Sequence, residues 1–146
     1  MERGESVKNI RIGAHRGAMC HATENTLAAF EKAIEFATYR VEFDVQRTSD
    51  GEIVLMHDLT VDQTTHGSGR IAELTLAELR QFEMDGGATI PTLAEALACL
   101  RGRSRALVEL KVSEVTEQVI GIIEQAGMVE ECTLVAFDES CMRLAK

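Results

Sequence analysis

Short apolar segments alternate with helical segments along most of this chain, and that alternation limits the folds open to it. Strand–helix alternation is typical of an α/β protein with a parallel sheet. The strands are predicted over residues 10–14, 40–47, 52–57, 105–111 and 132–137, and the main helices over 25–37, 92–100, 114–126 and from about 139. The helix over 25–37 repeats apolar residues at helical spacing, and Asn25 is its predicted N-cap.

The chain is too short to close a parallel barrel by itself. It has 146 residues, whereas a closed eight-stranded α/β barrel usually takes about 250 residues and at least about 200. The sequence therefore predicts one α/β domain over residues 1–146 that contains about five strand–helix units.

Residues 58–90 interrupt the alternation. This stretch is rich in threonine, glycine and charged residues. A capping box from Thr75 to Glu78 predicts one short helix within it, and a second box from Thr92 to Glu95 predicts where the regular pattern resumes. We expect residues 58–90 to form an excursion over a barrel or sheet face.

Composition excludes several classes of partner. The chain has 15 basic and 24 acidic residues and a net charge of −9, which disfavours binding to nucleic acids or anionic membranes. No segment approaches the roughly 20 apolar residues of a membrane span. No apolar run follows Met1–Ser6, so a secretory signal is not expected there. These features favour a cytoplasmic protein.

The cysteines are scattered and form no CxxC pair. Their spacing predicts reduced, buried thiols and argues against a structural zinc site. The four cysteines are Cys20, Cys99, Cys132 and Cys141.

The strand around residue 43 places two carboxylates on one face. Side chains alternate between the faces of a strand, so Glu42 and Asp44 share the face opposite to Val41, Phe43 and Val45. The apolar face is suited to packing beneath helices. The carboxylates then lie together on the other face of the sheet.

A second strand repeats the pattern, with Glu109 and Lys111 opposite to Val108 and Leu110. Charge on the inner faces of two strands is costly unless it is neutralised. Three carboxylates with one lysine do not balance, and oxygen ligands favour Mg²⁺ or Ca²⁺. The alternative is that these residues form solvent-facing salt bridges on an edge strand.

Two histidines follow predicted strands. His15 and His57 come at strand ends, where parallel α/β folds place their active sites, and imidazoles there can act as general acid and general base. Arg16 is a fixed cation suited to bidentate phosphate binding. His21 and His66 do not follow a strand, and we expect them in loops or on the surface.

Several motifs occur together in a recognisable order. They are His15–Gly17, Glu24–Thr26, Glu42–Asp44, His57–Asp58 and Glu109–Lys111, supported by Thr48–Gly51, Thr64–Gly69, Ile90–Leu93 and Val135–Asp138. In this order and spacing, from about residue 10 to the last residue, the chain resembles the glycerophosphodiester phosphodiesterases. The resemblance implies a TIM barrel with a small insertion after the third strand.

The resemblance also implies a reaction and a set of roles. The reaction is the metal-dependent hydrolysis of glycerophosphodiesters to glycerol 3-phosphate and an alcohol. The metal ligands for Mg²⁺ or Ca²⁺ would be Glu42, Asp44 and Glu109; the acid–base pair would be His15 and His57; Arg16 and Lys111 would bind phosphate; and Glu24 and Asn25 would support the site. Which histidine is the base, and which alcohol is preferred, stay open.

The chain departs from the family pattern in two main ways. Thr23 stands where the family usually has proline before the glutamate, and roughly the last three strand–helix units of the barrel are absent. Two alternatives therefore remain: a non-catalytic module that keeps the metal and phosphate ligands, and a phospholipase D-like relative of the same barrel. Exposed sheet edges would also favour self-association.

Overall fold

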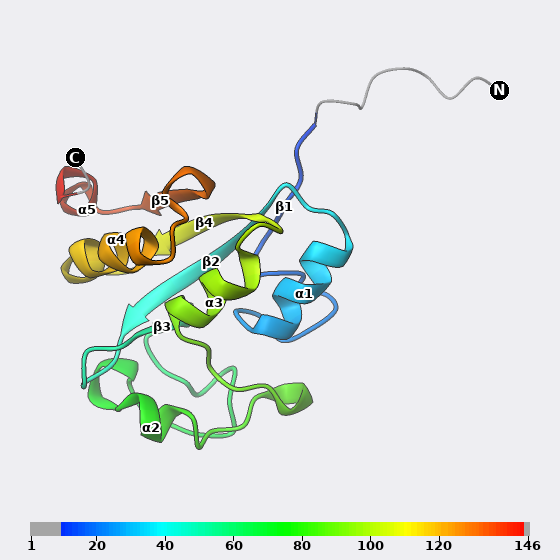
Figure 1. Ribbon diagram of the computed structural model, residues 1–146. Helices are drawn as coiled ribbons and strands as arrows, with labels where there is room; N and C mark the ends of the chain where they lie inside the picture. Colours follow the sequence, from blue (N-terminus) through cyan, green and yellow to red (C-terminus); the bar gives the residue numbers. More distant parts are fainter. Residues whose placement is uncertain (1–9, 145–146) are drawn as a thin grey trace.

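The computed structural model describes residues 10–144 and shows a central sheet with helices packed against it (Figure 1). Residues Met1–Ser6, where no signal was expected, lie outside the described residues. The strands are β1 Gly13–Ala14, β2 Arg40–Arg47, β3 Ile53–Leu55, β4 Arg105–Leu110 and β5 Cys132–Ala136. The α-helices are α1 Leu27–Glu35, α2 Leu76–Leu79, α3 Leu93–Leu100, α4 Thr116–Gln125 and α5 Glu139–Leu144. Single 3₁₀ turns cover Ile71–Glu73, Asp85–Gly87, Ser113–Val115 and Val129–Glu131.

The predicted α/β class of the parallel-barrel type is confirmed. Strands β1, β2, β4 and β5 are neighbours in that order and pair in parallel. Helices connect them, as parallel neighbours require. All four strands therefore direct their carboxyl ends to the same edge of the sheet.

The prediction that residues 52–57 form another parallel strand is wrong. β3 pairs antiparallel with β2, with Val45 opposite Leu55. The physical reason is the connection, because a parallel neighbour needs a crossover of a dozen or more residues. Here a tight turn reverses the chain: the Thr48 amide donates to the Glu52 carbonyl (2.9 Å), and Gly51 has a φ of 91°.

The alternation along β2 determines which face is apolar. Val41, Phe43 and Val45 are fully buried in the main core, which they share with apolar residues of α1, α3 and α4. Phe30 of α1 packs on Phe43 with ring centroids 5.2 Å apart. The helices therefore cover one face of the sheet, and Glu42 and Asp44 lie on the other.

Val54 of β3 and residues between β3 and α3 form a second apolar cluster. Its buried members are Val54, Met56, Val61, Ile71, Leu79, Met84 and Ile90. The two predicted capping boxes are both formed, at Thr75–Glu78 for α2 and at Thr92–Glu95 for α3. Burial raises the pKa of Glu95, but hydrogen bonds from the Thr92 amide and from Arg80 outweigh it and leave the pKa below its ordinary value.

The predicted N-cap of α1 is off by one residue. Thr26, not Asn25, caps the helix, since its hydroxyl accepts a hydrogen bond from the Ala29 amide at 3.2 Å. Asn25 instead has a left-handed backbone, with a φ of 55°, and its side chain turns toward the sheet. Its partner there is described with the site.

The cysteines are free thiols, but the expectation that they are all buried is wrong. Cys141 is buried, Cys99 and Cys132 are partly buried, and Cys20 is exposed. Desolvation raises the thiol pKa of both Cys99 and Cys132 to about 11. Within residues 10–144, no helix has the length and apolar character that a bilayer crossing requires.

Candidate active site

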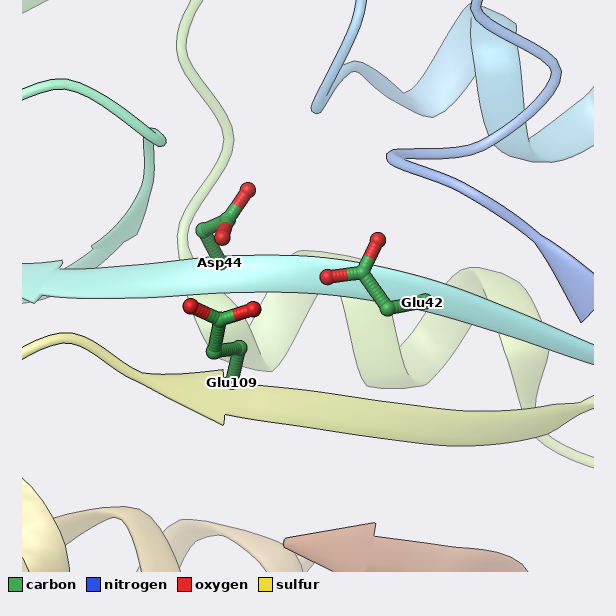
Figure 2. Close-up of side chains that lie close together, drawn as sticks. All are labelled: Glu42, Asp44 and Glu109. Carbon is green, nitrogen blue, oxygen red and sulfur yellow. The ribbon is translucent and has the colours of Figure 1, made fainter. Parts of the chain in front are cut away.

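Three carboxylates converge on the face of the sheet that the helices leave uncovered. Glu42 and Asp44 come from β2 and Glu109 from β4, and their ligand oxygens lie within 4.8 Å of one another (Figure 2). The register explains the convergence, because Asp44 is directly opposite Glu109 in the parallel pairing and Glu42 is two residues earlier on the same face.

These carboxylates are not on an edge strand, so the edge-strand alternative is wrong. β2 lies between β1 and β4, and β4 lies between β2 and β5. The side chains of Glu42, Asp44 and Glu109 are only 13%, 1% and 15% exposed. Negative charge held this far from water needs compensating cations.

Two cationic side chains supply part of that compensation. Lys111 Nζ is 2.9 Å from Asp44 Oδ1 and also contacts Glu109, and Arg16 Nε is 3.6 Å from Asp44 Oδ2. Burial lowers the pKa of Lys111, but its hydrogen bonds to Asp44 and Glu109 outweigh burial and raise the pKa above its ordinary value. Two cations against three carboxylates leave at least one negative charge, because Arg16 also pairs with a fourth carboxylate, that of Glu24, at 2.9 Å.

The pKa of Glu42 is raised by burial first and by the neighbouring carboxylates second. Desolvation raises its pKa above the ordinary value, and the neighbouring Asp44 carboxylate raises it further. The Arg16 amide opposes these effects by donating to Glu42 Oε2 at 2.8 Å. A divalent cation among these oxygens would remove the excess of negative charge. The donor set consists entirely of hard carboxylate oxygens, which suits Mg²⁺ or Ca²⁺.

The segment after β1 brings His15 and Arg16 to the cluster. His15 Nε2 is 3.8 Å from Glu42 Oε2, and the His15 side chain is 64% exposed. The turn depends on Gly17, which has a φ of 79° and donates its amide to the Glu42 carbonyl at 3.2 Å. A Cβ on Gly17 would lie 2.6 Å from the Cβ of Ala29 in α1, so the loop packs directly on that helix.

Glu24 and Asn25, predicted as supporting residues, form hydrogen bonds with Arg16 and Asp44 respectively. Glu24 Oε1 accepts from Arg16 at 2.9 Å. Asn25 forms two hydrogen bonds with Asp44, donating from Nδ2 to Asp44 Oδ2 (3.0 Å) and accepting at Oδ1 from the Asp44 amide (3.2 Å). This pair of bonds fixes both the backbone and the carboxylate of the most buried member of the cluster.

His57 reaches this region by a route that the sequence did not predict. Because β3 runs antiparallel to β2, the chain returns along β2, and the Met56 amide donates to the Asp44 carbonyl at 3.1 Å. His57 is the next residue. Its Nδ1 is 2.8 Å from Asp58 Oδ1, which leaves Nε2 as the ring nitrogen available for other groups.

Two residues near His57 had no role assigned to them from the sequence. Asp58 orients the imidazole, and the adjacent His–Asp dipeptide was the available signal for it. Gln46 is buried and hydrogen-bonds to the backbone around His57. The only signal for it in the sequence was its position two residues after Asp44, which places it on the same face of the strand. The His21 ring packs against Phe36 in a tilted arrangement, with ring centroids 4.8 Å apart, and His66 is exposed beside Asp85.

Comparison with known proteins assigns the chain to a family. Residues 15–140 match the model of the glycerophosphoryl diester phosphodiesterase family. The chain is 33% identical over 147 residues to a glycerophosphodiester phosphodiesterase of Caldanaerobacter subterraneus, covering 91% of this chain and 60% of that protein.

Solved structures agree with that assignment. The crystal structure of a glycerophosphodiester phosphodiesterase from Agrobacterium tumefaciens superposes with a TM-score of 0.86 at 32% identity, over 92% of this chain and 61% of that one. A phosphodiesterase of Oleispira antarctica, solved with the product sn-glycerol-3-phosphate, gives 0.83 at 31% identity, over 94% and 61%. The chain spans 60% of the Caldanaerobacter subterraneus relative and 50% of a Bacillus subtilis relative to which it is 39% identical over 125 residues.

Proposed function

Because the chain belongs to the glycerophosphoryl diester phosphodiesterase family, we propose that it hydrolyses glycerophosphodiesters to glycerol 3-phosphate and an alcohol with the help of a divalent cation. The observation that carries this proposal is the convergence of Glu42, Asp44 and Glu109 beside Arg16 and Lys111. The Oleispira antarctica relative, solved with sn-glycerol-3-phosphate, supports the choice of product.

The three carboxylates would hold Mg²⁺ or Ca²⁺. When bound, the cation supplies Lewis-acid polarisation of a phosphate oxygen and neutralises the phosphodiester anion. Lys111 and Arg16 both contact Asp44, so their charged nitrogens lie at the rim of the same cluster. From there they would bind the remaining phosphate oxygens and stabilise the charge that develops on them in the transition state.

The two histidines would transfer protons on either side of the phosphorus. One imidazole would take the proton of the attacking hydroxyl as the new O–P bond forms; that hydroxyl belongs to a water, or to the substrate glycerol, in which case the resulting cyclic phosphate is opened by a water in a second step. The other imidazolium gives its proton to the oxygen of the departing alcohol as that P–O bond breaks. Asp58, bonded to His57 Nδ1, favours proton exchange at Nε2 of His57. His15 is well exposed, which suits exchange with solvent between turnovers.

The test is release of glycerol 3-phosphate from glycerophosphocholine, measured with Mg²⁺ or Ca²⁺ and with a chelator. We expect activity in the presence of the cation and its loss in the chelator. Removing an acid–base group costs about 10²–10⁴-fold, so His15→Ala should lose activity to that extent. Glu42→Gln should lose cation affinity. His66→Ala is the matched control, because His66 is exposed and pairs with Asp85. Full activity in His15→Ala and Glu42→Gln would overturn the proposal.

A second candidate is a module that binds the cation and phosphate without turnover. The observation that favours it is length, since the chain spans only 61% of each of the two solved relatives. Cation binding by calorimetry, without hydrolysis of the diester at any cation concentration, would support the module. Light scattering on the same sample would show whether the edges of β1 and β5, which end the sheet, lead to self-association.

A further inference from the structure

We infer that Gln46 is a positioning residue that holds the His57 segment against the strand bearing the carboxylates; this inference rests on the proposed function. Gln46 is the residue of β2 that lies two positions after Asp44 on the same face of the sheet. It is 5% exposed. A buried amide side chain needs hydrogen-bond partners, and the identity of those partners indicates its role.

The partners of Gln46 are three consecutive backbone carbonyls. Its Nε2 lies 3.1 Å from the carbonyl oxygen of Met56, 3.2 Å from that of His57 and 2.5 Å from that of Asp58. An amide nitrogen has only two hydrogens, so the three acceptors share them. The carbonyls of the residues before, at and after the imidazole thus converge on one side-chain nitrogen.

The Met56–Asp58 segment needs these hydrogen bonds because the pairing between β2 and β3 stops just before it. β3 ends at Leu55, and the Met56 amide still donates to the Asp44 carbonyl at 3.1 Å. Beyond that bond, the chain leaves the strand and enters residues 57–59, which form bends. The Gln46 amide continues the attachment to β2 through the first two residues of the loop.

Gln46 and Asp58 therefore position different parts of His57. Gln46 fixes where the backbone of His57 lies relative to Asp44, because it is anchored on the same strand. Asp58 fixes the rotation of the ring through His57 Nδ1. A proton-transfer group displaced by about 1 Å can cost about 10²-fold in rate, so loss of the Gln46 bonds should act on the chemical step.

The experiment replaces Gln46 by methionine, which has a similar length and lacks the amide hydrogens. The matched control is Gln118→Met, because Gln118 also donates from Nε2 to a backbone carbonyl, that of Gly51 at 2.7 Å, but lies exposed on α4. Both variants are compared with the unmodified chain by diesterase kinetics, by calorimetric cation binding, and by the imidazole ¹⁵N and ¹H resonances of His57.

In Gln46→Met we expect kcat to fall about 10–100-fold, with KM and cation affinity within twofold of the unmodified chain. The His57 ring resonances should move in Gln46→Met and stay in place in Gln118→Met. A role in stability alone would lower the unfolding midpoint and leave kcat and the His57 resonances of the folded protein unchanged; that result would overturn the inference. Equal losses of kcat and cation affinity would also overturn it.

Gln46→Asn keeps the inference testable if the methionine variant does not fold. Asparagine retains the amide and shortens the side chain by one methylene, so we expect the same displacement of the His57 resonances. Resonances unchanged in that variant would again overturn the positioning role. The His57 resonances do not depend on turnover. If the unmodified chain did not hydrolyse the diester, the proposed function would be contradicted, and the resonances would still decide whether Gln46 positions His57.

Discussion

Replacement of Asn25 is the substitution whose effects can be followed furthest from the structure. Asn25 is 1% exposed and has a φ of 55°. Its side chain donates to Asp44 Oδ2 at 3.0 Å and accepts from the Asp44 amide at 3.2 Å. Substitution therefore removes one bond to a charged group, leaves a buried N–H without its acceptor, and changes the tolerance for a left-handed backbone.

Comparing the glycine and alanine variants separates the cost of the lost hydrogen bonds from the cost of the left-handed backbone. The bond to the carboxylate is worth about 1.5–3 kcal/mol, and an orphaned buried donor costs about 1–3 kcal/mol. We expect Asn25→Gly, which tolerates positive φ, to lose about 2.5–6 kcal/mol of unfolding free energy, the sum of these two contributions. Asn25→Ala should lose about 1–2 kcal/mol more, because alanine is strained in the left-handed region. Denaturant unfolding at fixed pH measures both differences.

Cation affinity is the second measurement on the same variants. Residues that hold a metal ligand in place typically change affinity about 10–100-fold when they are removed. We expect a decrease of that size in both variants, by calorimetry with Mg²⁺ or Ca²⁺. The control is Thr26→Ala, which removes the helix cap at the next residue and should cost about 1 kcal/mol in stability with cation affinity unchanged. Cation affinity within twofold in Asn25→Gly and Asn25→Ala would refute the role assigned to Asn25.

Three further predictions concern other parts of the molecule. Burial raises the pKa of Glu95, but its hydrogen bonds lower the pKa by more, so that it lies below 4.5 in the folded state. The ionised Glu95 side chain therefore stabilises the fold above pH 4.5, and this stabilisation is lost as the pH falls through the lowered pKa. Glu95→Gln should therefore cost about 0.3–1.5 kcal/mol at pH 7 and clearly less at pH 3.5, by denaturant unfolding; an equal cost at both would contradict this. Cys99 and Cys132, with thiol pKa values of about 11, should react with iodoacetamide at pH 7.5 more slowly than exposed Cys20, as peptide mapping would show; equal rates would count against it. Gly17→Ala should lower stability by more than about 1–2 kcal/mol, because its Cβ would lie 2.6 Å from a neighbouring Cβ; an unchanged unfolding midpoint would contradict that packing.

The features that the sequence predicted correctly depend on local periodicity. Alternation along β2 placed Glu42 and Asp44 opposite Val41 and Phe43, and burial confirms the apolar side. The capping boxes of α2 and α3 are equally local, since each is closed by residues three apart.

The features that the sequence did not predict depend on how segments meet. The direction of β3 is set by a tight turn, and periodicity is the same for parallel and antiparallel strands. The sequence around Asn25 predicts a helix cap, but its side chain hydrogen-bonds to Asp44, on a strand 19 residues away. The contacts of Gln46 exist only because the antiparallel register brings Met56–Asp58 back alongside β2.

The central claim is that the three carboxylates hold a divalent cation that the hydrolysis requires. The most direct test follows glycerophosphocholine by ³¹P nuclear magnetic resonance in the presence of the chain, before and after Mg²⁺ or Ca²⁺ is added. We expect the diester resonance to give way to that of glycerol 3-phosphate only after the addition, and to persist with Asp44→Asn. An unchanged diester resonance at saturating cation, or equal conversion in a chelator, would contradict the claim.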